Sequence, residues 1–378
     1  MPGVTERPAL DAVLTGCTMV IAADRRSGDL ATALERRGAQ VYRAPALTIL
    51  PNADDDLLLQ RTRELIAHPP DVVIVTTGVG FRGWMDAAHE NGLADDLAAA
   101  FRGTQFVARG PKAHGAIQQA GFVADWVAET ETAAEVGEYL TQLGVAGKRI
   151  AVQHHGAGAD GLDELMTAHG ADAVSITVYR WGPPPDPKIV SRSAMQAATG
   201  EVDAVLFTSA PGAAEWIRAA ERGGRLDAIR DRAAAGRLLL ASVGPVTATP
   251  LVAARLQTTL AVRGRLGSLV RCVVDHYANG TAPTLMTVAG TIEVRSGGAV
   301  LDGRFIPLSR ASANVLGALF DAGGRVLSRE ELGRVLPRGG ENAHAVEMSI
   351  ARLREALGCP EAVKTVIKRG YRLAVQED

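Results

Sequence analysis

Four short sequence blocks occur twice along this chain, in the same order. A single strand–helix unit resembles many others, but chance does not explain four blocks matched in order. The sequence therefore predicts two related halves. The matched blocks are 18–23 with 148–153, 35–41 with 167–174, 71–80 with 203–212, and 104–117 with 237–251.

Each half alternates apolar, β-branched runs with helical stretches. TMVIAA at 18–23 precedes a stretch that ends at Gly38, and DVVIVTTG at 71–78 is followed by another. This alternation predicts an α/β fold with a parallel, doubly wound sheet in each half. The passage YRWGPPPDPK at 179–188 has too many prolines for a helix or a central strand, so it is predicted to be an extended crossover.

The strand-like runs of both halves end in hydroxyl residues or in Gly-Pro, and helices follow. Ligands of α/β sheets bind at the carboxyl ends of strands, where helix N-termini favour anionic groups. Each hydroxyl taken singly is better explained as a helix cap, but the paired set predicts a cleft for a polycarboxylate or phosphate. The set comprises Thr76, Thr77, Gly110, Thr208, Ser209, Gly244 and Thr247.

No motif in the chain predicts a metal or a cofactor. His154 and His155 lack partners at metal-ligand spacing, and adjacent residues on a strand point to opposite faces. GAGADG at 156–161 matches a dinucleotide fingerprint formally, but Asp172 comes too early to supply the acid that binds ribose. We therefore expect no bound cofactor.

Composition points to an ordinary globular protein of two or three domains. The 378 residues are 47% hydrophobic and 22% charged, and three cysteines lie far apart, which fits a reducing cytoplasm without disulfides or zinc. The N-terminal stretch lacks the pattern of a signal peptide, and no apolar run approaches the roughly 18 residues of a membrane span. We expect a cytoplasmic protein with no membrane partner.

The last part of the chain has a different pattern. AHAVEMSIARLREALG at 343–358 has the periodicity of a helix with one apolar stripe, which predicts that the helix docks on a core. The stripe comprises Val346, Ile350, Leu353 and Leu357, and the opposite face carries His344, Met348, Ala351, Arg352 and Glu355.

A basic strand pair follows this helix at 363–373. Its cations are not interrupted by an acid, whereas residues 288–378 as a whole hold 13 Lys and Arg against 11 Asp and Glu. A docked helix beside a basic hairpin predicts a helix in the DNA major groove and a wing on phosphates, with affinity from local clustering of charge. The cations are Lys364, Lys368, Arg369 and Arg372.

Motifs spread over residues 17–275 carry a family resemblance: DRRSGDLATALERRGAQVYRAPAL, DVVIVTTGVGF, VARGPKAHGAI, GADAVSITVYR, AVLFTSAPGA and SVGPVTATPL. This resemblance is to uroporphyrinogen-III synthase. It implies two α/β domains, one made of 17–49 and 179–276 and the other of 50–178. It also implies cofactor-independent closure of hydroxymethylbilane, a linear tetrapyrrole with many carboxylates.

The resemblance also assigns individual residues. It places the catalytic tyrosine of the family on Tyr179, with a hinge aromatic as the alternative, and it adds Arg25 and Lys112 to the ligand-binding set. The usual Thr-Arg-Pro is Asp24-Arg25-Arg26 here, and Gly110-Pro111-Lys112-Ala113 lacks the usual threonine. These departures weaken the enzymatic interpretation.

The tail contains the stretch VLDGRFIPLSRASANVLGALFDAGGRVLSREEL, in which Ser328 with Glu331 forms a capping box. This stretch matches the opening strands and helices of the winged-helix output domain of response regulators, which residues 288–375 resemble. The resemblance implies a recognition helix at 344–357 and a wing at 365–373. A winged helix that binds another protein is the alternative.

The same resemblance implies the DNA contacts. Arg352 would contact a base or a phosphate and Thr365 a phosphate, while Arg354, nearer the docked face, is expected to form a structural ion pair. Ile367 and Lys368 stand where the wing usually has Arg-Gly, which moves the expected phosphate contacts toward Lys368 and Arg369. The predicted DNA-binding residues are His344, Met348, Ser349, Arg352, Thr365, Lys368 and Arg369.

These observations predict a transcriptional regulator with a linker at 277–287 between a ligand-binding body and a DNA-binding tail. Strand ends carry no phosphoacceptor acids, so a phosphorelay is not expected. The partners expected are double-stranded DNA, a tetrapyrrole or other polycarboxylate or anionic small molecule, and, further, other transcription factors or RNA polymerase. The rival hypothesis is an active uroporphyrinogen-III synthase that carries an accessory DNA-binding domain.

Overall fold

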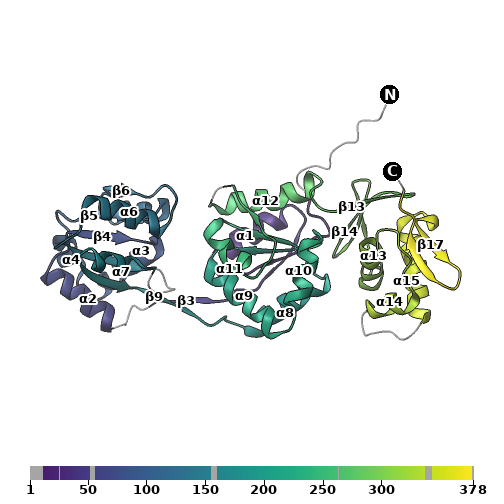
Figure 1. Ribbon diagram of the computed structural model, residues 1–378, viewed down its shortest axis with the longest axis horizontal. Coiled ribbons are helices and arrows are strands. Elements are labelled where there is room, and N and C mark those ends of the chain that lie inside the picture. The colour runs from purple at the N-terminus through teal and green to yellow at the C-terminus, as the bar shows by residue number, and fades with distance from the viewer. Residues whose placement is uncertain are drawn as a thin grey trace, which may run out of the picture. The chain divides into compact units, whose positions relative to one another are not determined.

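A computed structural model describes residues 12–24, 26–51, 56–154, 160–262, 264–336 and 343–376, without the side chains of 49–51, 179–180 and 343. The chain divides into two compact units (Figure 1). The second unit is Thr48–Gly182, called lobe 2 here, and the rest forms the first unit. Within the first unit we call residues 12–47 and 183–278 lobe 1, and residues 284–376 the tail domain.

Lobe 1 is a parallel sheet of order β12-β11-β10-β1-β2, covered on both faces. Alternate residues of a strand point to opposite faces, so Met19 and Ile21 pack under α1 and α12, while Val20 packs with the helices α8 to α11. The strands are β1 (Thr18–Ile21), β2 (Gln40–Arg43), β10 (Ala204–Phe207), β11 (Leu239–Ser242) and β12 (Thr259–Leu260). The helices are α1 (Ser27–Glu35), α8 (Pro187–Thr199), α9 (Ala210–Arg222), α10 (Leu226–Ala234), α11 (Pro245–Ala253) and α12 (Leu266–Ala278).

Lobe 2 has a second five-stranded parallel sheet, of order β6-β5-β4-β7-β8. One face packs against α2 to α5 around Phe81 and Trp84, and the other against α6 and α7. The strands are β4 (Val72–Val75), β5 (Gln105–Ala108), β6 (Trp126–Val127), β7 (Arg149–His154) and β8 (Asp172–Thr177). The helices are α2 (Asp56–Ala67), α3 (Gly78–Glu90), α4 (Ala94–Ala100), α5 (Pro111–Gln119), α6 (Ala133–Leu143) and α7 (Leu162–Ala168).

The two sheets confirm the duplication predicted from the matched blocks. β1, β2, β10 and β11 occupy the same places in the order of their sheet as β7, β8, β4 and β5. The copies agree even in one buried hydrogen bond: the indole N–H of Trp84 in α3 donates to Thr62 and that of Trp216 in α9 donates to Ser193, both at 3.0 Å. Thr62 lies in α2, which precedes β4, and Ser193 lies in α8, which precedes β10.

The predicted crossover at 179–188 is extended only in its first part. β9 (Tyr179–Gly182) pairs antiparallel with β3 (Thr48–Pro51) in a two-stranded ribbon. Beyond it the prediction is wrong, because α8 already begins at Pro187. Proline is tolerated at the first position of a helix, and Asp186 accepts the free N–H groups of Lys188 and Ile189 as the N-cap.

The tail domain is an antiparallel sheet followed by three helices and a hairpin, around one core. Its first strand starts at Thr284, so the predicted linker at 277–287 is too long at both ends, since α12 continues to Ala278. The strands are β13 (Thr284–Thr287), β14 (Gly290–Arg295), β15 (Gly298–Leu301), β16 (Arg304–Pro307), β17 (Val363–Val366) and β18 (Gly370–Leu373). The helices are α13 (Arg310–Asp321), α14 (Arg329–Arg334), α15 (Ala343–Leu357) and a 3-10 turn at Pro360–Ala362.

Within the described ranges, no helix is both long and apolar enough to cross a membrane.

Candidate DNA-binding surface and ligand-binding edges

The helix α15 buries the predicted stripe and exposes the predicted face. Val346, Ile350, Leu353 and Leu357 are each at most 3% exposed, whereas the five residues of the opposite face are exposed. Ser349 does not belong to the exposed face, because its side chain is buried and its hydroxyl donates to the Ala345 carbonyl at 2.9 Å. A position between stripe and face cannot be assigned from periodicity alone.

The helix α14 is held in front of α15 by the predicted capping box. The Ser328 hydroxyl accepts the Glu331 N–H, and the Glu331 carboxylate accepts the Ser328 N–H at 2.7 Å, which also lowers the pKa of Glu331. Arg329 reaches from α14 to Glu347 on α15, 3.2 Å away, and lies over the ring of Tyr371. Helix α14 and the neighbouring hairpin therefore fix the orientation of α15.

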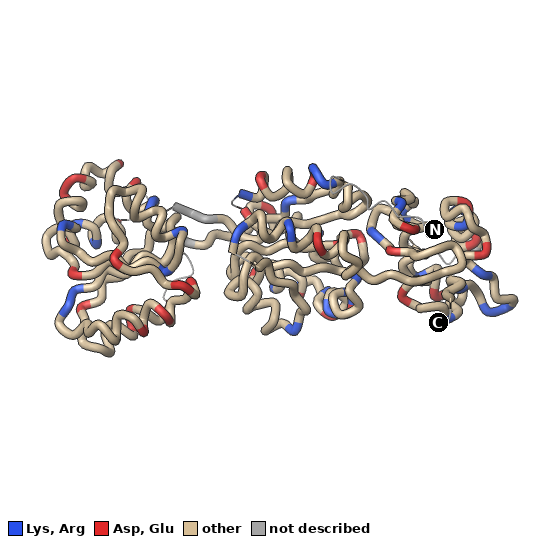
Figure 2. Tube along the Cα trace, turned by 90° about the horizontal axis from the view of Figure 1, so that it is seen from above, with Lys and Arg blue, Asp and Glu red and all other residues tan. Residues whose placement is uncertain are grey.

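The hairpin of β17 and β18 forms the predicted wing and exposes its turn. Lys364, Thr365, Lys368 and Arg369 are exposed, and no Asp or Glu lies in β17, in β18 or in the turn between them. Figure 2 marks the Lys and Arg positions of the described residues in blue and the Asp and Glu positions in red. Gly370 has a φ of 131°, and a Cβ there would stand 1.9 Å from the Leu327 carbonyl oxygen. The hairpin thus lies backbone to backbone against the residue that precedes the α14 cap.

Arg354 joins α15 to the wing. Its guanidinium donates to the Val363 carbonyl at 2.6 and 2.9 Å and to the Thr365 hydroxyl at 2.8 Å. The expected structural role is therefore observed, but through neutral acceptors instead of the expected ion pair. Because the Thr365 oxygen accepts from Arg354, its hydroxyl proton remains available to donate to another group.

The carboxyl edges of both sheets carry the predicted hydroxyls, in part as caps. Thr77 accepts the Gly80 N–H at the start of α3, and Ser209 accepts the Gly212 N–H at the start of α9. Thr208 is half-buried and Thr247 is buried. A capping hydroxyl accepts one helix N–H and keeps its own proton, so capping does not remove these groups as ligand donors.

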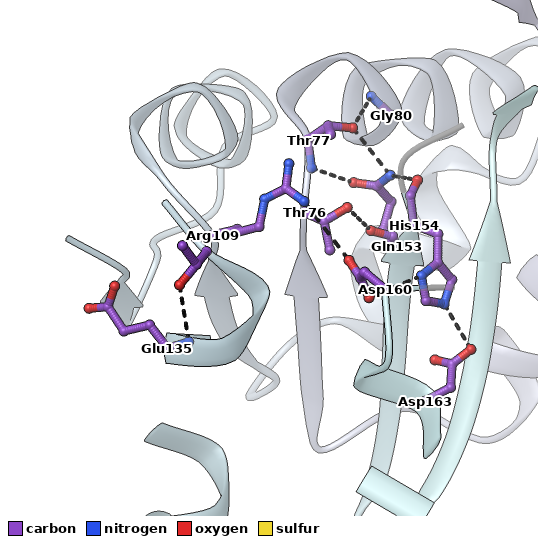
Figure 3. A network of polar contacts seen from close by, with 10 residues as sticks. Thr76, Thr77, Gly80, Arg109, Glu135, Gln153, His154, Asp160 and Asp163 are labelled. Atoms are coloured by element: carbon purple, nitrogen blue, oxygen red, sulfur yellow. Dashed lines mark hydrogen bonds and ion pairs between the residues drawn. The ribbon is translucent and has the colours of Figure 1, made fainter. Parts of the chain in front are cut away.

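In lobe 2 the edge is organised by Gln153, the penultimate residue of β7. Its carbonyl accepts from the buried Thr76 hydroxyl at 2.7 Å, and its side-chain oxygen accepts the Thr77 N–H at 3.2 Å (Figure 3). Gly80 allows this approach, because a Cβ there would be 2.0 Å from the Gln153 amide nitrogen. Gly110 is the N-cap of α5 and Lys112 is exposed in its first turn.

A buried charge cluster beside these residues was not predicted. The His154 ring lies 2.8 Å from Asp163 and 3.7 Å from Asp160, and Arg109 lies 3.9 Å from Asp160 (Figure 3). Burial alone would lower the pKa of His154, but the effect of the two carboxylates is larger and raises the pKa to about 9. Two cations thus balance two carboxylates at this edge.

The sequence offered little sign of this cluster. Asp160 and Asp163 follow the strand through residues 155–159, which lie outside the described residues, and the spacing from His154 matches no metal motif. Among the described residues, no group of three His, Cys, Asp or Glu side chains could hold a metal ion. The ion pairs instead fix the start of α7 against the end of β7.

Comparison with known families decides what the body is. The family profile described as uroporphyrinogen-III synthase HemD matches residues 28–271, which is more than half of the chain. This chain belongs to the uroporphyrinogen-III synthase family. A second profile, the C-terminal domain of transcriptional regulatory proteins, matches residues 303–373. The tail domain is therefore a winged-helix, DNA-binding domain of the transcriptional-regulator class fused to a HemD-like body.

Each of the following known proteins is similar to one part of the chain. The HemD-like body is similar to YjjA of Bacillus subtilis, an uncharacterized protein, with 28% identity over 269 residues, 70% of this chain and 97% of YjjA. A mutant uroporphyrinogen III synthase from Thermus thermophilus has the same fold, with a TM-score of 0.58, 24% identity, and coverage of 70% of this chain and 99% of that one. The RstA DNA-binding domain of Klebsiella pneumoniae is also matched, with 27% identity, a TM-score of 0.20, and coverage of 24% of this chain and 96% of that one.

Two residues assigned by the uroporphyrinogen-III synthase resemblance escape a geometric test. Arg25 lies outside the described residues, between the end of β1 and α1. The backbone of Tyr179 opens β9, opposite Pro51, but its side chain is not among those described. Their roles remain predictions.

Proposed function

We propose that this protein is a transcriptional regulator whose HemD-like body binds a tetrapyrrole or another anionic small molecule and whose tail domain binds double-stranded DNA. The observation that carries the proposal is the surface formed by α15 and the wing. Arg352 is exposed on the helix, Lys368 and Arg369 are exposed on the turn, and Arg354 braces the two elements. A cytoplasmic location, and contacts with RNA polymerase or other transcription factors, remain predictions from the sequence.

The DNA-binding part is tested by anisotropy of a labelled mixed-sequence duplex over a salt series. Each phosphate contact contributes about 0.9 to the slope of log K against log salt. We expect the Arg352→Ala/Lys368→Ala/Arg369→Ala variant to lose about 2 to 3 from this slope. A wild-type protein with no salt-dependent binding would instead support a winged helix that binds protein.

A matched control removes three cations from lobe 1. Arg218 and Arg222 in α9 pair with Glu215 on the same helix, and Arg225 is exposed beyond it. The Arg218→Ala/Arg222→Ala/Arg225→Ala variant changes the net charge by the same amount. Equal losses in the two variants would mean that bulk charge, not the winged-helix surface, holds the DNA.

The ligand-binding part is tested by calorimetric titration with uroporphyrin III, a polycarboxylate of the expected class. We expect binding that weakens in Thr208→Ala/Ser209→Ala, because both hydroxyls lie at the carboxyl end of β10. Thr199→Ala, an exposed hydroxyl at the end of α8, is the control. Absence of wild-type binding, or equal weakening in the control, would contradict this assignment.

Family membership supports a second candidate, an active uroporphyrinogen-III synthase. A coupled assay with hydroxymethylbilane separates the two candidates. Turnover by the wild-type protein that falls in Tyr179→Phe would establish the enzyme, and no turnover would exclude it.

A further inference from the structure

The edge at which the lobe 1 strands begin is occupied by the tail domain. Asp203 directly precedes β10, and one oxygen of its carboxylate accepts the N–H of Thr18 at the start of β1, at 2.7 Å. The other oxygen accepts the N–H of Ser296, in the turn between β14 and β15, at 2.8 Å. The Ser296 hydroxyl lies within hydrogen-bond distance of both Asp203 and Thr18. One carboxylate therefore joins two lobe 1 strands to a hairpin of the tail.

Burial makes this carboxylate dependent on its donors. Asp203 is 6% exposed, and burial raises its pKa while the bonds from Ser296 and Thr18 lower it. A buried acceptor that loses its donors destabilises the fold by more than the hydrogen bond itself contributes, because its desolvation is then uncompensated. The Asp203 carboxylate accepts the Thr18 N–H within lobe 1, and Ser296 of the tail supplies a further donor that lobe 1 does not.

A second side chain of the same hairpin enters lobe 1. Arg295 is 6% exposed and donates to the carbonyls of Val13 and Thr15, each at 2.8 Å. Its Nε lies 2.6 Å from Glu293, which neutralises the charge. The guanidinium also lies over the ring of Tyr277 in α12, 5.3 Å from its centre. The tail therefore supplies the donors for a segment that precedes the first strand of the body.

The backbone of the tail at Gly297 also lies directly against the backbone of lobe 1 at Gly16, with no side chain between them. The Gly297 N–H donates to the Gly16 carbonyl at 2.9 Å. Gly16 has a φ of +80°, and a Cβ there would fall 2.0 Å from the ring of Phe305 in β16. Both glycines are required by a close contact between tail and lobe, which a flexible tether would not need.

The duplication supplies an internal comparison. Asp71 precedes β4 in lobe 2 as Asp203 precedes β10, and it accepts the N–H of Arg149 at the start of β7, also at 2.7 Å. Asp71 is exposed, whereas Asp203 is buried under Ser296. Both copies therefore have an aspartate that joins two strands, Asp71 in lobe 2 and Asp203 in lobe 1. Asp203 in addition contacts Ser296 of the tail domain.

We propose that Asp203, Arg295 and Ser296 form a latch that makes lobe 1 and the winged-helix domain one cooperative unit. A structural change at β1 or β10 is then transmitted to the DNA-binding domain. β10 has four residues, and Thr208 and Ser209, the proposed ligand residues, follow its other end. The meaning of the latch for regulation rests on the proposed function, but the latch itself does not. The connection from the proposed ligand edge to the DNA-binding domain is then a short buried strand.

Hydrogen exchange of the full-length chain, read by mass spectrometry, tests the latch. In Asp203→Asn and in Ser296→Ala we expect exchange of residues 290–301 and 204–207 to accelerate together, by about tenfold or more, because each variant leaves a buried partner unsatisfied. The double variant is expected to exchange no faster than the faster single variant, since both act on the same bonds. Asp71→Asn is the matched control and is expected to leave both segments unchanged.

The outcomes separate the latch from the proposed function. Exchange of residues 290–301 that stays at the wild-type rate in Asp203→Asn would overturn the latch, as would additive effects in the double variant. Accelerated exchange in both segments, in a protein that does not bind the mixed-sequence duplex, would uphold the latch and refute the DNA-binding proposal.

Discussion

The buried His154 cluster makes the stability of lobe 2 depend on pH in a predictable direction. The imidazolium has an ordinary pKa of about 6.5 when the chain is unfolded and a pKa of about 9 in the folded protein. A raised folded-state pKa stabilises the fold fully below pH 6.5, and the contribution is lost as pH rises through about 9. One pKa unit corresponds to about 1.4 kcal/mol, so the contribution lost is about 3 kcal/mol.

Urea unfolding followed by tryptophan fluorescence measures this loss. Trp84, Trp126 and Trp181 belong to lobe 2 and Trp216 to lobe 1, so a Trp216→Phe background restricts the signal to lobe 2. We expect His154→Gln to be less stable than its parent at about pH 6.5. The difference in free energy of unfolding should shrink by about 3 kcal/mol between about pH 6.5 and pH 9.5, because above about pH 9 neither side chain carries the charge that Asp160 and Asp163 need.

The exposed His169, on the same lobe, provides the control. The difference between His169→Gln and its parent, measured over the same range, shows what replacing another histidine of this lobe does. A difference for His154→Gln that does not change with pH, or that grows with pH, would show that His154 is not held as a cation, and the charge balance described for this edge would be wrong.

Two further predictions concern the winged helix. Gly370→Ala is expected to lower the free energy of unfolding by about 2 kcal/mol or more, since a Cβ would meet the Leu327 carbonyl oxygen. Gly358→Ala, also at positive φ but in open space, is the control and is expected to cost only the backbone strain of about 1 kcal/mol. Thermal unfolding compares the two variants, and equal losses would contradict the close contact at Gly370. Arg354→Ala is expected to weaken duplex binding about tenfold at low salt, because Thr365 loses its orientation. Adding Thr365→Val to the Arg354→Ala protein should then cause no further loss of affinity. Anisotropy measures both variants, and additive losses of affinity would refute the bracing role of Arg354.

Features that depend on local periodicity could be predicted from the sequence. The α15 stripe repeats every three or four residues, and the capping box of Ser328 and Glu331 needs only two residues three apart. The kinship of the two sheets followed from the matched blocks, since duplicated sequences fold alike. The two-residue slip at Pro187 shows the limit, because proline is compatible with both a loop and the first turn of a helix.

Features that depend on contacts between distant segments could not be predicted. Asp203 and Ser296 are separated by 93 positions, and neither belongs to a motif. Asp203 also has the same sequence context as Asp71, so the difference in burial between the two copies has no signal in either block. The His154 cluster was missed because the positions of Asp160 and Asp163 relative to His154 match no motif, and the first strand of the tail sheet was missed because Thr284–Thr287 has the composition of a linker.

The ribbon of β3 and β9 determines how lobe 2 is inserted in the chain. Thr48 pairs with Gly182, so the polypeptide enters and leaves this lobe through two adjacent backbone positions. Opposed residues of an antiparallel pair lie about 5 Å apart, a gap that a turn of about two residues closes. Lobe 2 is therefore an insertion that can be removed: a gene fusion that joins Leu47 to Pro183 through such a turn would preserve every strand of lobe 1 and every latch residue.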